Sequence, residues 1–382
     1  MRETLPLVPE PAAPTPAAPP APVAVLSAPA ADAVAAVDIS VVLCTRDRCQ
    51  SLRRTLASFT RQVVPAGLVW ELVLVDNGST DATADVIAEF GGRLPIRCVL
   101  EPQPGASRAR NAGIRASRGD IVAFTDDDCL PDPDWLERLW LEFRAEPELA
   151  GLGGRVELAD PADRPVSIRT SARRDRLAGP DLLFGGIPGC NTAFVRCVFV
   201  SVGLYDPGFG PGSPLPAAEH SDLAYRVFRA GFRVDYVPEL VVRHAHGRRS
   251  DDAVGEANRR YIVGRGGFYT KHILRGDVAI LRSAYWELSA AMRALAERMR
   301  GDTPVQPVLR DVRYLFVGML RGVPLAWRRG GRLAPAPAAP GATAPGAAPA
   351  ETARAAAAPV LGASATAAGA TPIAAPPAAA AD

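Results

Sequence analysis

Lysine is almost absent from this chain of 382 residues: nearly every cation is an arginine, and Lys271 is the exception. The formal net charge is only +2, so the composition gives no global bias toward nucleic acid. No segment reaches the roughly 20 consecutive apolar residues that cross a bilayer. The N-terminal segment also lacks the basic start and uninterrupted apolar run of a signal peptide. We therefore expect a cytoplasmic protein, either soluble or peripheral on the inner face of the plasma membrane.

The cysteines lack the CxxC spacing that is typical of zinc and redox sites. They are Cys44, Cys49, Cys98, Cys129, Cys190 and Cys197. Most of them lie inside apolar segments, as buried thiols do in a reducing cytoplasm. We therefore expect neither a disulfide framework nor a thiolate metal site.

The two ends of the chain differ in composition from its middle. Residues 5–37 and 334–382 consist almost entirely of alanine, proline, glycine and small polar residues. Such segments cannot bury enough apolar surface to offset the conformational entropy lost on folding. We therefore expect disordered tails at 1–37 and 333–382, on either side of a folded region.

Apolar strands alternate with helical segments in the folded region. Strands are predicted at 38–44, 70–76, 96–101, 120–125 and 150–157, and helices at 49–62, 81–90, 105–117 and 133–145, with Pro133 as a first helical residue. Further on, we expect helices at 196–202 and 219–231, strands at 233–237 and 239–244, and mainly helix over 251–330. The loops at 158–188 and 206–218 interrupt this pattern. Alternation of this kind is typical of a mainly parallel sheet, which binds its ligand at the carboxyl ends of its strands.

Carboxylates follow the apolar strands at two places. The strand at 120–125 runs directly into Asp126, Asp127 and Asp128, and the strand at 70–76 ends in Asp76. A carboxylate pair spaced i, i+2 projects to one side of an extended chain, where it can meet a divalent ion that carries a diphosphate. The same alternation predicts that Asp127 faces away, as an acid that supports the neighbouring site residues or caps a helix.

Four segments together resemble a known family. They are the strand at 39–45, VDNGSTD at 75–81, GASRARNAG at 105–113, and the three aspartates followed by PDPDWL at 131–136. In this order and spacing, over residues 38–246, they resemble the family 2 inverting glycosyltransferases, which have the GT-A fold. The resemblance implies a Rossmann-like, mixed and mainly parallel α/β sheet flanked by helices. We expect a nucleotide-sugar half at 38–130, an acceptor half at 131–250 and a basic helical extension at 251–332.

The resemblance also implies a donor site for a nucleoside-diphosphate sugar. Asp76 would hydrogen-bond the nucleobase, while Thr45 and Arg48 line the same edge of the sheet. The alternative for Asp76 is to cap the helix at 81–90, although Ser79 or Thr80 would suit that position better.

Cationic and amide side chains near a helix start favour a diphosphate, as do the free backbone N–H groups there. The segment contains Arg108, Arg110 and Asn111. Because two arginines spaced i, i+2 do not share a helix face, at most one should reach the ligand. We assign Arg108 and Asn111 to nucleotide-sugar binding.

By resemblance, Asp126 would lie near the ribose and Asp128 on a Mg²⁺ or Mn²⁺ ion that bridges the two phosphates. His244 matches a histidine that closes such sites beside the metal. The ion would offset the charge that develops on the leaving nucleoside diphosphate.

An inverting transfer needs one base to deprotonate the acceptor hydroxyl. The family usually supplies it from Glu-Asp-x-Asp-Leu at a helix start, and the matching stretch here reads EHSDL at 219–223. His220 therefore stands where the base is expected. The candidates are Glu219, which we favour, then Asp222, and His220 itself. A noncatalytic sugar-nucleotide or glycan-binding relative with a degenerate motif is the alternative.

The resemblance places Gly189 and Asn191 in the acceptor wall, where glycine permits close approach and the amide can bind a sugar hydroxyl. We therefore predict an enzyme that glycosylates a glycan, a lipid-linked sugar or a glycosylated metabolite. A nucleotidyltransferase is disfavoured, because its Gly-rich, basic phosphate loop is missing after the first strand.

The segment at 251–332 contains 15 Lys/Arg against 8 Asp/Glu, together with the apolar run YLFVGML at 314–320. These features favour an amphipathic surface for an anionic inner leaflet. An ordinary helical cap with a solvated basic face explains them equally well.

Overall fold

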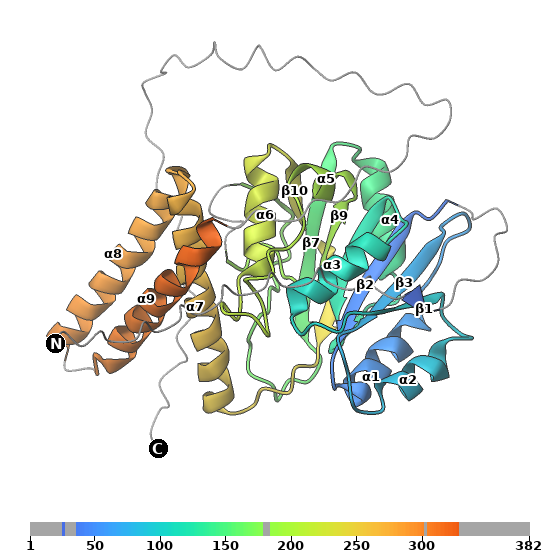
Figure 1. Ribbon diagram of the computed structural model, residues 1–382, viewed down its shortest axis with the longest axis horizontal. Helices are drawn as coiled ribbons and strands as arrows, with labels where there is room; N and C mark the ends of the chain where they lie inside the picture. Colours follow the sequence, from blue (N-terminus) through green and yellow to red (C-terminus); the bar gives the residue numbers. More distant parts are fainter. Residues whose placement is uncertain (1–24, 27–35, 179–183, 302–303, 328–382) are drawn as a thin grey trace, which may run out of the picture. The chain divides into compact units, whose positions relative to one another are not determined.

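The computed structural model describes residues 25–26, 36–178, 184–301 and 304–327, and its described strands form one mixed sheet (Figure 1). The strands are β1 Val25–Leu26, β2 Ile39–Thr45, β3 Trp70–Asp76, β4 Ile96–Leu100, β5 Ile121–Asp126, β6 Cys129–Pro131, β7 Leu149–Leu158, β8 Asp175–Leu177, β9 Thr192–Val195 and β10 Arg233–His244. Their order is β1-β4-β3-β2-β5-β9-β7-β10-β6, and β8 pairs with β10. The neighbours β4, β3, β2 and β5 are parallel, whereas β9 runs antiparallel to β5. The predicted α/β class with a mixed, mainly parallel sheet is confirmed.

Helices pack on both faces of this sheet, and the last three described helices lie beside it around a core of their own. The described helices are α1 Cys49–Phe59, α2 Thr83–Phe90, α3 Ala106–Ala116, α4 Trp135–Ala145, α5 Cys197–Ser201, α6 Glu219–Arg229, α7 Asp251–Leu274, α8 Ala279–Arg300 and α9 Gln306–Ala326. Side chains alternate along β2, so that Val41 and Leu43 join α1 and α4 in one core, while Val42 joins α3 and α6 in the other. Two apolar layers therefore hold the sheet between them. Among the described residues, no helix is both long enough and apolar enough to cross a membrane.

The structure differs from the sequence prediction at several places, one of them the predicted loop 158–188, which contains the strand β8. Val25–Leu26 pair with β4 as a short strand, although we expected them in a disordered tail; the rest of that tail up to residue 35, and all of the predicted C-terminal tail, lie outside the described residues. The two strands predicted at 233–237 and 239–244 form one strand, β10, with a register shift between Val237 and Val241.

Pro133 is not helical, and this prediction is wrong. Helix α4 begins at Trp135 and Asp134 occupies its N-cap position. The reason is the strand β6, which pairs with β10 and extends the chain, while the N–H of Asp132 donates to the carbonyl of Val241. The chain becomes helical only after this pairing ends.

The helices α7 and α9 pack backbone to backbone beside the sheet (Figure 1). A Cβ atom on Gly266 would lie 2.1 Å from the carbonyl oxygen of Leu315, and one on Gly318 would lie 2.0 Å from that of Val263. Distances this short leave no room for a side chain. The glycines therefore set the approach of the two helices.

We expect Gly318→Ala to lower the free energy of unfolding by about 2 kcal/mol, because the added methyl must push α7 and α9 apart. Gly255→Ala is the matched control: it lies in α7, and its Cβ would meet nothing within 4 Å. That change should be neutral or stabilising by up to about 1 kcal/mol. Urea unfolding followed by circular dichroism measures both. Equal effects of the two substitutions would contradict the close packing.

Candidate active site

Three parallel strands end side by side at one edge of the sheet. In the register of the sheet, Thr45 at the end of β2 lies opposite Asp76 of β3, and Cys44 lies opposite Asp126 of β5. The N–H of Asn77 donates to the carbonyl of Thr45 at 2.9 Å, which carries the pairing one residue further. The carboxylates predicted from the strand ends therefore meet at one edge.

Asp76 is half-buried at this edge and has one oxygen engaged locally. Its Oδ1 accepts from the N–H of Ser79 at 2.8 Å. The start of α2 is held by a different acid, because Asp81 accepts from both the N–H and the hydroxyl of Thr83. The alternative role of Asp76 as the cap of this helix is therefore not supported.

Asp127 does not face away from the site, and that prediction is wrong. Strand β5 ends at Asp126, so the following residues form a turn in which strand alternation no longer applies. The Asp127 carboxylate accepts from the hydroxyl of Thr45 at 2.7 Å and lies 3.2 Å from Nε of Arg48. Burial raises the pKa of Asp127 to about 7 even though Arg48 opposes this shift.

Arg48 also pairs with Asp128, whose second partner is His244. An Asp128 oxygen lies 2.7 Å from the Arg48 guanidinium, and the other lies 3.2 Å from Nε2 of His244. Burial alone would raise the pKa of Asp128, but His244 and Arg48 outweigh it and hold that pKa below its usual range. Burial likewise opposes protonation of the imidazole, and the Asp128 hydrogen bond nevertheless raises the pKa of His244 to about 9.

These residues contain donors suited to a divalent ion. The ligand atoms of Asp128, Cys129 and His244 are buried and lie within 4.8 Å of one another. Burial raises the pKa of Cys129 well above that of an ordinary thiol, so its sulfur stays protonated and is a poor ligand. A carboxylate and an imidazole fit Mn²⁺ or Mg²⁺ when a bound ligand supplies further oxygens.

The structure buries Arg110, and not the predicted Arg108, between the strand end and α6. Arg108 is exposed and donates to Gln103 at 2.9 Å. Arg110 is buried and reaches Asp126 at 3.0 Å and Glu219 at 3.1 Å. The positions of these residues along the predicted helix could have indicated that Arg110 is buried.

The buried face of α3 contains Ser107, Arg110 and Ile114, which follow the i, i+3, i+7 pattern of a helix face. Arg108 lies outside that pattern. A cation on an otherwise apolar or small-residue face is the signal that the sequence analysis missed.

Asn111 is committed to the protein instead of facing a ligand. Its amide nitrogen donates to the carbonyl of Tyr205 at 2.8 Å, and its oxygen accepts from the N–H of the same residue at 2.9 Å. A buried amide needs such partners, because leaving it unpaired is costly. Asn111 therefore positions Tyr205, and these contacts give no support to its predicted contact with the nucleotide sugar.

Asn191 is also fully engaged within the core, so the structure does not support its predicted role in acceptor binding. Its oxygen accepts from the indole N–H of Trp135 at 2.9 Å. Its nitrogen donates to the carbonyls of Arg155 and Leu240, both at 2.9 Å. Asn191 therefore joins β7, β10 and α4, and it is completely buried.

Glu219 and His220 begin helix α6 and adjoin the acidic edge through Arg110. Burial raises the pKa of Glu219, although Arg110 opposes the shift.

His220 packs against Gly189, where a Cβ atom would lie 2.1 Å from the imidazole, so only glycine fits. Its Nδ1 lies 3.1 Å from the hydroxyl of Tyr205, while its Nε2 is buried and has no hydrogen-bond partner among the described residues. Burial, helped by Arg110, holds the pKa of His220 well below its usual value, so the ring is neutral.

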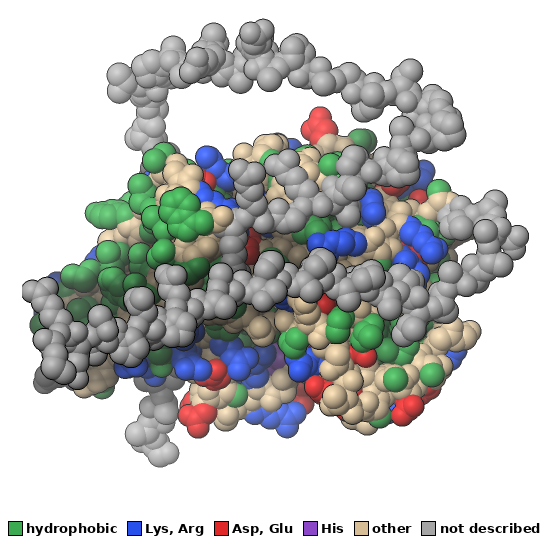
Figure 2. All heavy atoms as spheres, in the orientation of Figure 1, with side chains coloured by type: hydrophobic (Ala, Val, Ile, Leu, Met, Phe, Trp, Pro, Cys, Tyr) green, Lys and Arg blue, Asp and Glu red, His purple; other side chains and the backbone are tan. Residues whose placement is uncertain are grey.

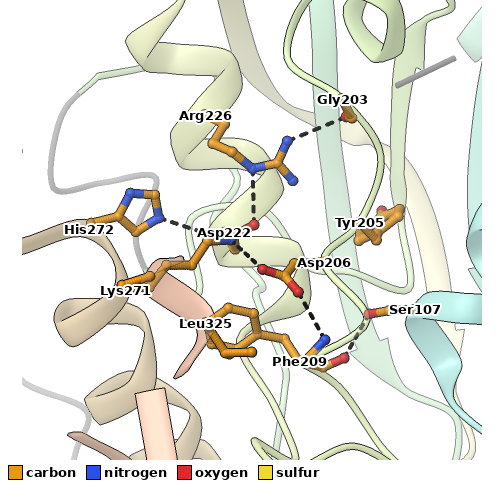
Figure 3. A network of polar contacts seen from close by, with 12 residues as sticks. Ser107, Gly203, Tyr205, Asp206, Phe209, Asp222, Arg226, Lys271, His272 and Leu325 are labelled. Atoms are coloured by element: carbon orange, nitrogen blue, oxygen red, sulfur yellow. Dashed lines mark hydrogen bonds and ion pairs between the residues drawn. The ribbon is translucent and has the colours of Figure 1, made fainter. Parts of the chain in front are cut away.

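Asp222, the second candidate base, is enclosed in a network of basic side chains (Figure 3). It is fully buried and lies 2.6 Å from Lys271, 3.0 Å from Arg226 and 3.0 Å from His272. Burial alone would raise its pKa, but these partners hold the pKa of Asp222 well below its ordinary value. A carboxylate in this state is a weak base, which makes Asp222 a poorer candidate than Glu219.

Lys271 bridges two carboxylates that belong to different segments. Its ammonium lies 2.9 Å from Asp206, in the loop before α6, and 2.6 Å from Asp222 on α6 itself. Helix α7 is thereby attached to the segment that presents Glu219. The sequence analysis noticed this lysine only for its rarity.

Comparison with known proteins identifies relatives of the chain. The family model for Glycosyl transferase family 2 matches residues 40–195. A glucosyl-dolichyl phosphate glucuronosyltransferase of Haloferax volcanii is 30% identical over 220 residues, covering 54% of this chain and 68% of that protein. A pre-mycofactocin glycosyltransferase of Mycobacterium tuberculosis is 29% identical over 214 residues, covering 55% of this chain but only 43% of that protein.

A solved structure supports the same fold. The mannosyltransferase of Pyrobaculum calidifontis, in complex with GDP-Man and Mn²⁺, superposes with a TM-score of 0.50 at 21% identity, covering 75% of this chain and 86% of that one. At this identity the likeness concerns the fold alone. It agrees with the fold expected from the sequence.

We expect Lys271→Met to lower the free energy of unfolding by about 3 kcal/mol or more, because it leaves the buried Asp206 without its cation and removes one of the cations that face Asp222. The control is Arg115→Met on α3, an exposed arginine with no ion pair among the described residues, which should change stability by less than about 0.5 kcal/mol. Urea unfolding measures both. A Lys271→Met variant as stable as the parent chain would contradict the bridging role.

Proposed function

The chain belongs to glycosyl transferase family 2 and is a glycosyltransferase, and we propose that it transfers a sugar from a nucleoside-diphosphate sugar to a hydroxyl group with inversion at the anomeric carbon. One observation carries this proposal. The buried guanidinium of Arg110 contacts both Asp126, at the donor edge, and Glu219, the candidate base. A base beside the donor edge is what a single displacement requires.

In this proposal, the donor occupies the carboxyl ends of β2, β3 and β5. The second oxygen of Asp76 binds the nucleobase, Asp126 lies near the ribose, and Arg48 and Thr45 hold the acidic turn in place. Support comes from the half-exposed position of Asp76 and from the contacts of Arg48 with the turn. Asp128 and His244 would hold a Mg²⁺ or Mn²⁺ ion, which when bound neutralises charge on the departing diphosphate.

Glu219 is the proposed base that accepts the proton of the attacking hydroxyl. Its raised pKa makes it a stronger base than an exposed glutamate, and Arg110 keeps a share of it ionised. His220 stays neutral, so it offers the acceptor a hydrogen bond from its unpartnered nitrogen instead of a charge. Gly189 makes room for this ring.

The proposed acceptor is a glycan, a lipid-linked sugar or a glycosylated metabolite, and we extend the proposal to peripheral contact with an anionic membrane. The names of two relatives, one acting on a dolichyl-phosphate sugar and one on pre-mycofactocin, support this range. Histidine in the motif favours a second candidate function, that of a noncatalytic relative which binds sugar nucleotides or glycans. Measured transfer of a sugar from donor to acceptor distinguishes the transferase from the noncatalytic binding protein.

We expect Glu219→Gln to reduce kcat by about 100- to 10,000-fold, because the amide cannot accept the proton. Nucleotide-sugar binding should persist, since Glu219 does not face the donor in this proposal. Initial rates with a panel of acceptors, together with donor affinity by calorimetry, measure the two effects. Full activity of this variant would remove Glu219 as the base.

The pH profile tests the same residue. Only the ionised carboxylate is active, so kcat/KM should fall as the pH drops through the raised pKa of Glu219, at a higher pH than for an exposed glutamate. Arg110 lowers that pKa, so Arg110→Gln should move this acidic limb to still higher pH. The control Arg115→Gln should leave the limb in place. An unmoved limb in Arg110→Gln would assign the titration to another group.

A thermal-shift panel of UDP, GDP, dTDP and CMP sugars, with and without Mn²⁺, tests the donor site. We expect one nucleotide to raise Tm in a metal-dependent manner, because the ion links the diphosphate to Asp128. Asp128→Asn should abolish the metal-dependent part of the shift. A shift unaffected by Mn²⁺ and by this substitution would contradict the proposed metal site.

A further inference from the structure

A basic cleft lies between α7 and α9, away from the donor edge. It has a volume of about 320 Å³, and its charged lining residues are Arg259, Arg260, Arg313 and Arg321. Glu256 is the acid that contacts the first two, at 2.8 and 3.1 Å. Arg313 and Arg321 have no hydrogen bond or ion pair with any described residue. Four guanidinium groups against one carboxylate leave a surplus of positive charge that suits a phosphate group.

Helix α8 has an apolar stripe that no described residue covers. Its members recur at i, i+4, i+7, i+11 and i+18 and are 45–73% exposed: Leu281, Tyr285, Leu288, Met292 and Met299. Figure 2 shows hydrophobic side chains gathered over this helix. Single exposed apolar residues are ordinary, but a stripe five residues long on one helix face marks an interaction surface.

Helix α9 has a second stripe of the same kind beside its arginines. It contains Leu309, Phe316, Leu320, Val323 and Trp327, which are 42–75% exposed. Its helix positions place it next to the face of Arg313 and Arg321 that lines the cleft. Apolar and cationic surfaces are therefore adjacent on one helix.

We propose that the exposed apolar stripes of α8 and α9 dock on an anionic lipid bilayer, and that the arginine cleft between α7 and α9 receives a lipid phosphate. This deepens the membrane contact in the proposed function. Amphipathic helices with arginine beside an apolar face lie in the plane of anionic membranes. The exposed rings of Tyr285, Trp286 and Trp327 suit the level of the headgroups.

Charge favours a bilayer over a second copy of this chain. The described residues of the extension, 251–301 and 304–327, contain 12 Lys/Arg against 7 Asp/Glu, a net charge of +5, so two copies of this extension would repel each other. An anionic leaflet attracts the same charges. No described helix could cross the bilayer, so the contact would be at its surface.

The cleft also adjoins the loop that precedes the candidate base. Pro216 lines it, and the next residue, Ala217, lies against Gly264 of α7, where a Cβ atom would come within 2.7 Å. Docking would therefore bring the start of α6, with Glu219, close to the membrane surface. That position suits an acceptor whose lipid remains in the bilayer.

Flotation of the full chain with vesicles tests this inference without any turnover. We expect binding to vesicles of phosphatidylcholine and phosphatidylglycerol, weak binding to phosphatidylcholine alone, and release by salt. The double substitution Arg313→Gln with Arg321→Gln should lower the partition coefficient on anionic vesicles about 25-fold, at roughly fivefold for each charge. Arg54→Gln with Arg115→Gln, two exposed arginines without ion pairs on α1 and α3, should have little effect.

The apolar stripe has its own variant and control. Leu288→Ser with Met292→Ser should weaken vesicle binding about tenfold or more, because both side chains would insert among the lipids. Leu141→Ser on α4, 51% exposed, is the matched control and should bind as the parent chain does. A nucleotide-dependent rise in Tm that persists in every variant verifies folding.

The outcomes separate this inference from the proposed function. Absence of binding to anionic vesicles, with nucleotide binding intact, would overturn the inference and leave the glycosyltransferase proposal standing. If the chain self-associates, does not bind vesicles, and loses self-association in the Leu288→Ser with Met292→Ser variant, then the stripe binds a second copy of the chain. If the chain binds inorganic diphosphate saturably but does not bind vesicles, and the Arg313 and Arg321 variant loses diphosphate binding, then the cleft binds a free anion. Either result also overturns the lipid assignment.

Discussion

The buried guanidinium of Arg110 is the interaction on which the rest of the site depends. Burying one cation costs several kcal/mol unless anions offset it. Here Asp126 and Glu219 do so: burial opposes the charge of Arg110, but these two carboxylates outweigh it and raise the pKa of the guanidinium. Because Asp126 ends a strand and Glu219 begins a helix, their shared partner connects the donor edge to the candidate base. The ion pairs of Arg110 with these two carboxylates thus join the two halves of the site.

The C-terminal helices support this arrangement from behind. Helix α7 binds the first turns of α6 through Lys271, which neutralises Asp206 and Asp222. Helix α9 in turn packs on α7 through glycine contacts that admit no side chain. A rigid support of this kind positions catalytic groups better than a loop would. The same two helices also present the basic cleft and apolar stripes, so one extension both supports the site and offers a surface.

The sheet and most of its helices could be predicted from the sequence, because apolar periodicity and strand-end acids depend on local chemistry. The errors occurred where tertiary contacts decide. Asp127 turned inward because β5 had already ended, and α4 started late because β6 pairs with β10. The roles of motif residues also depend on their surroundings. Asn111 hydrogen-bonds the backbone of Tyr205, and Asn191 accepts a hydrogen bond from the indole of Trp135.

The sequence by itself determined the family resemblance, the α/β class and the clustering of Asp76, Asp126 and Asp128 at one edge. These follow from hydrophobic periodicity and from the rule that parallel strands end together. Only the tertiary structure decided which arginine lies inside and which motif carboxylate is free to act. Both questions concern partners far away in the chain: Arg110 meets Glu219 from another segment, and Asp222 is neutralised from α7. A charge's role depends on what surrounds it, and local sequence does not contain that information.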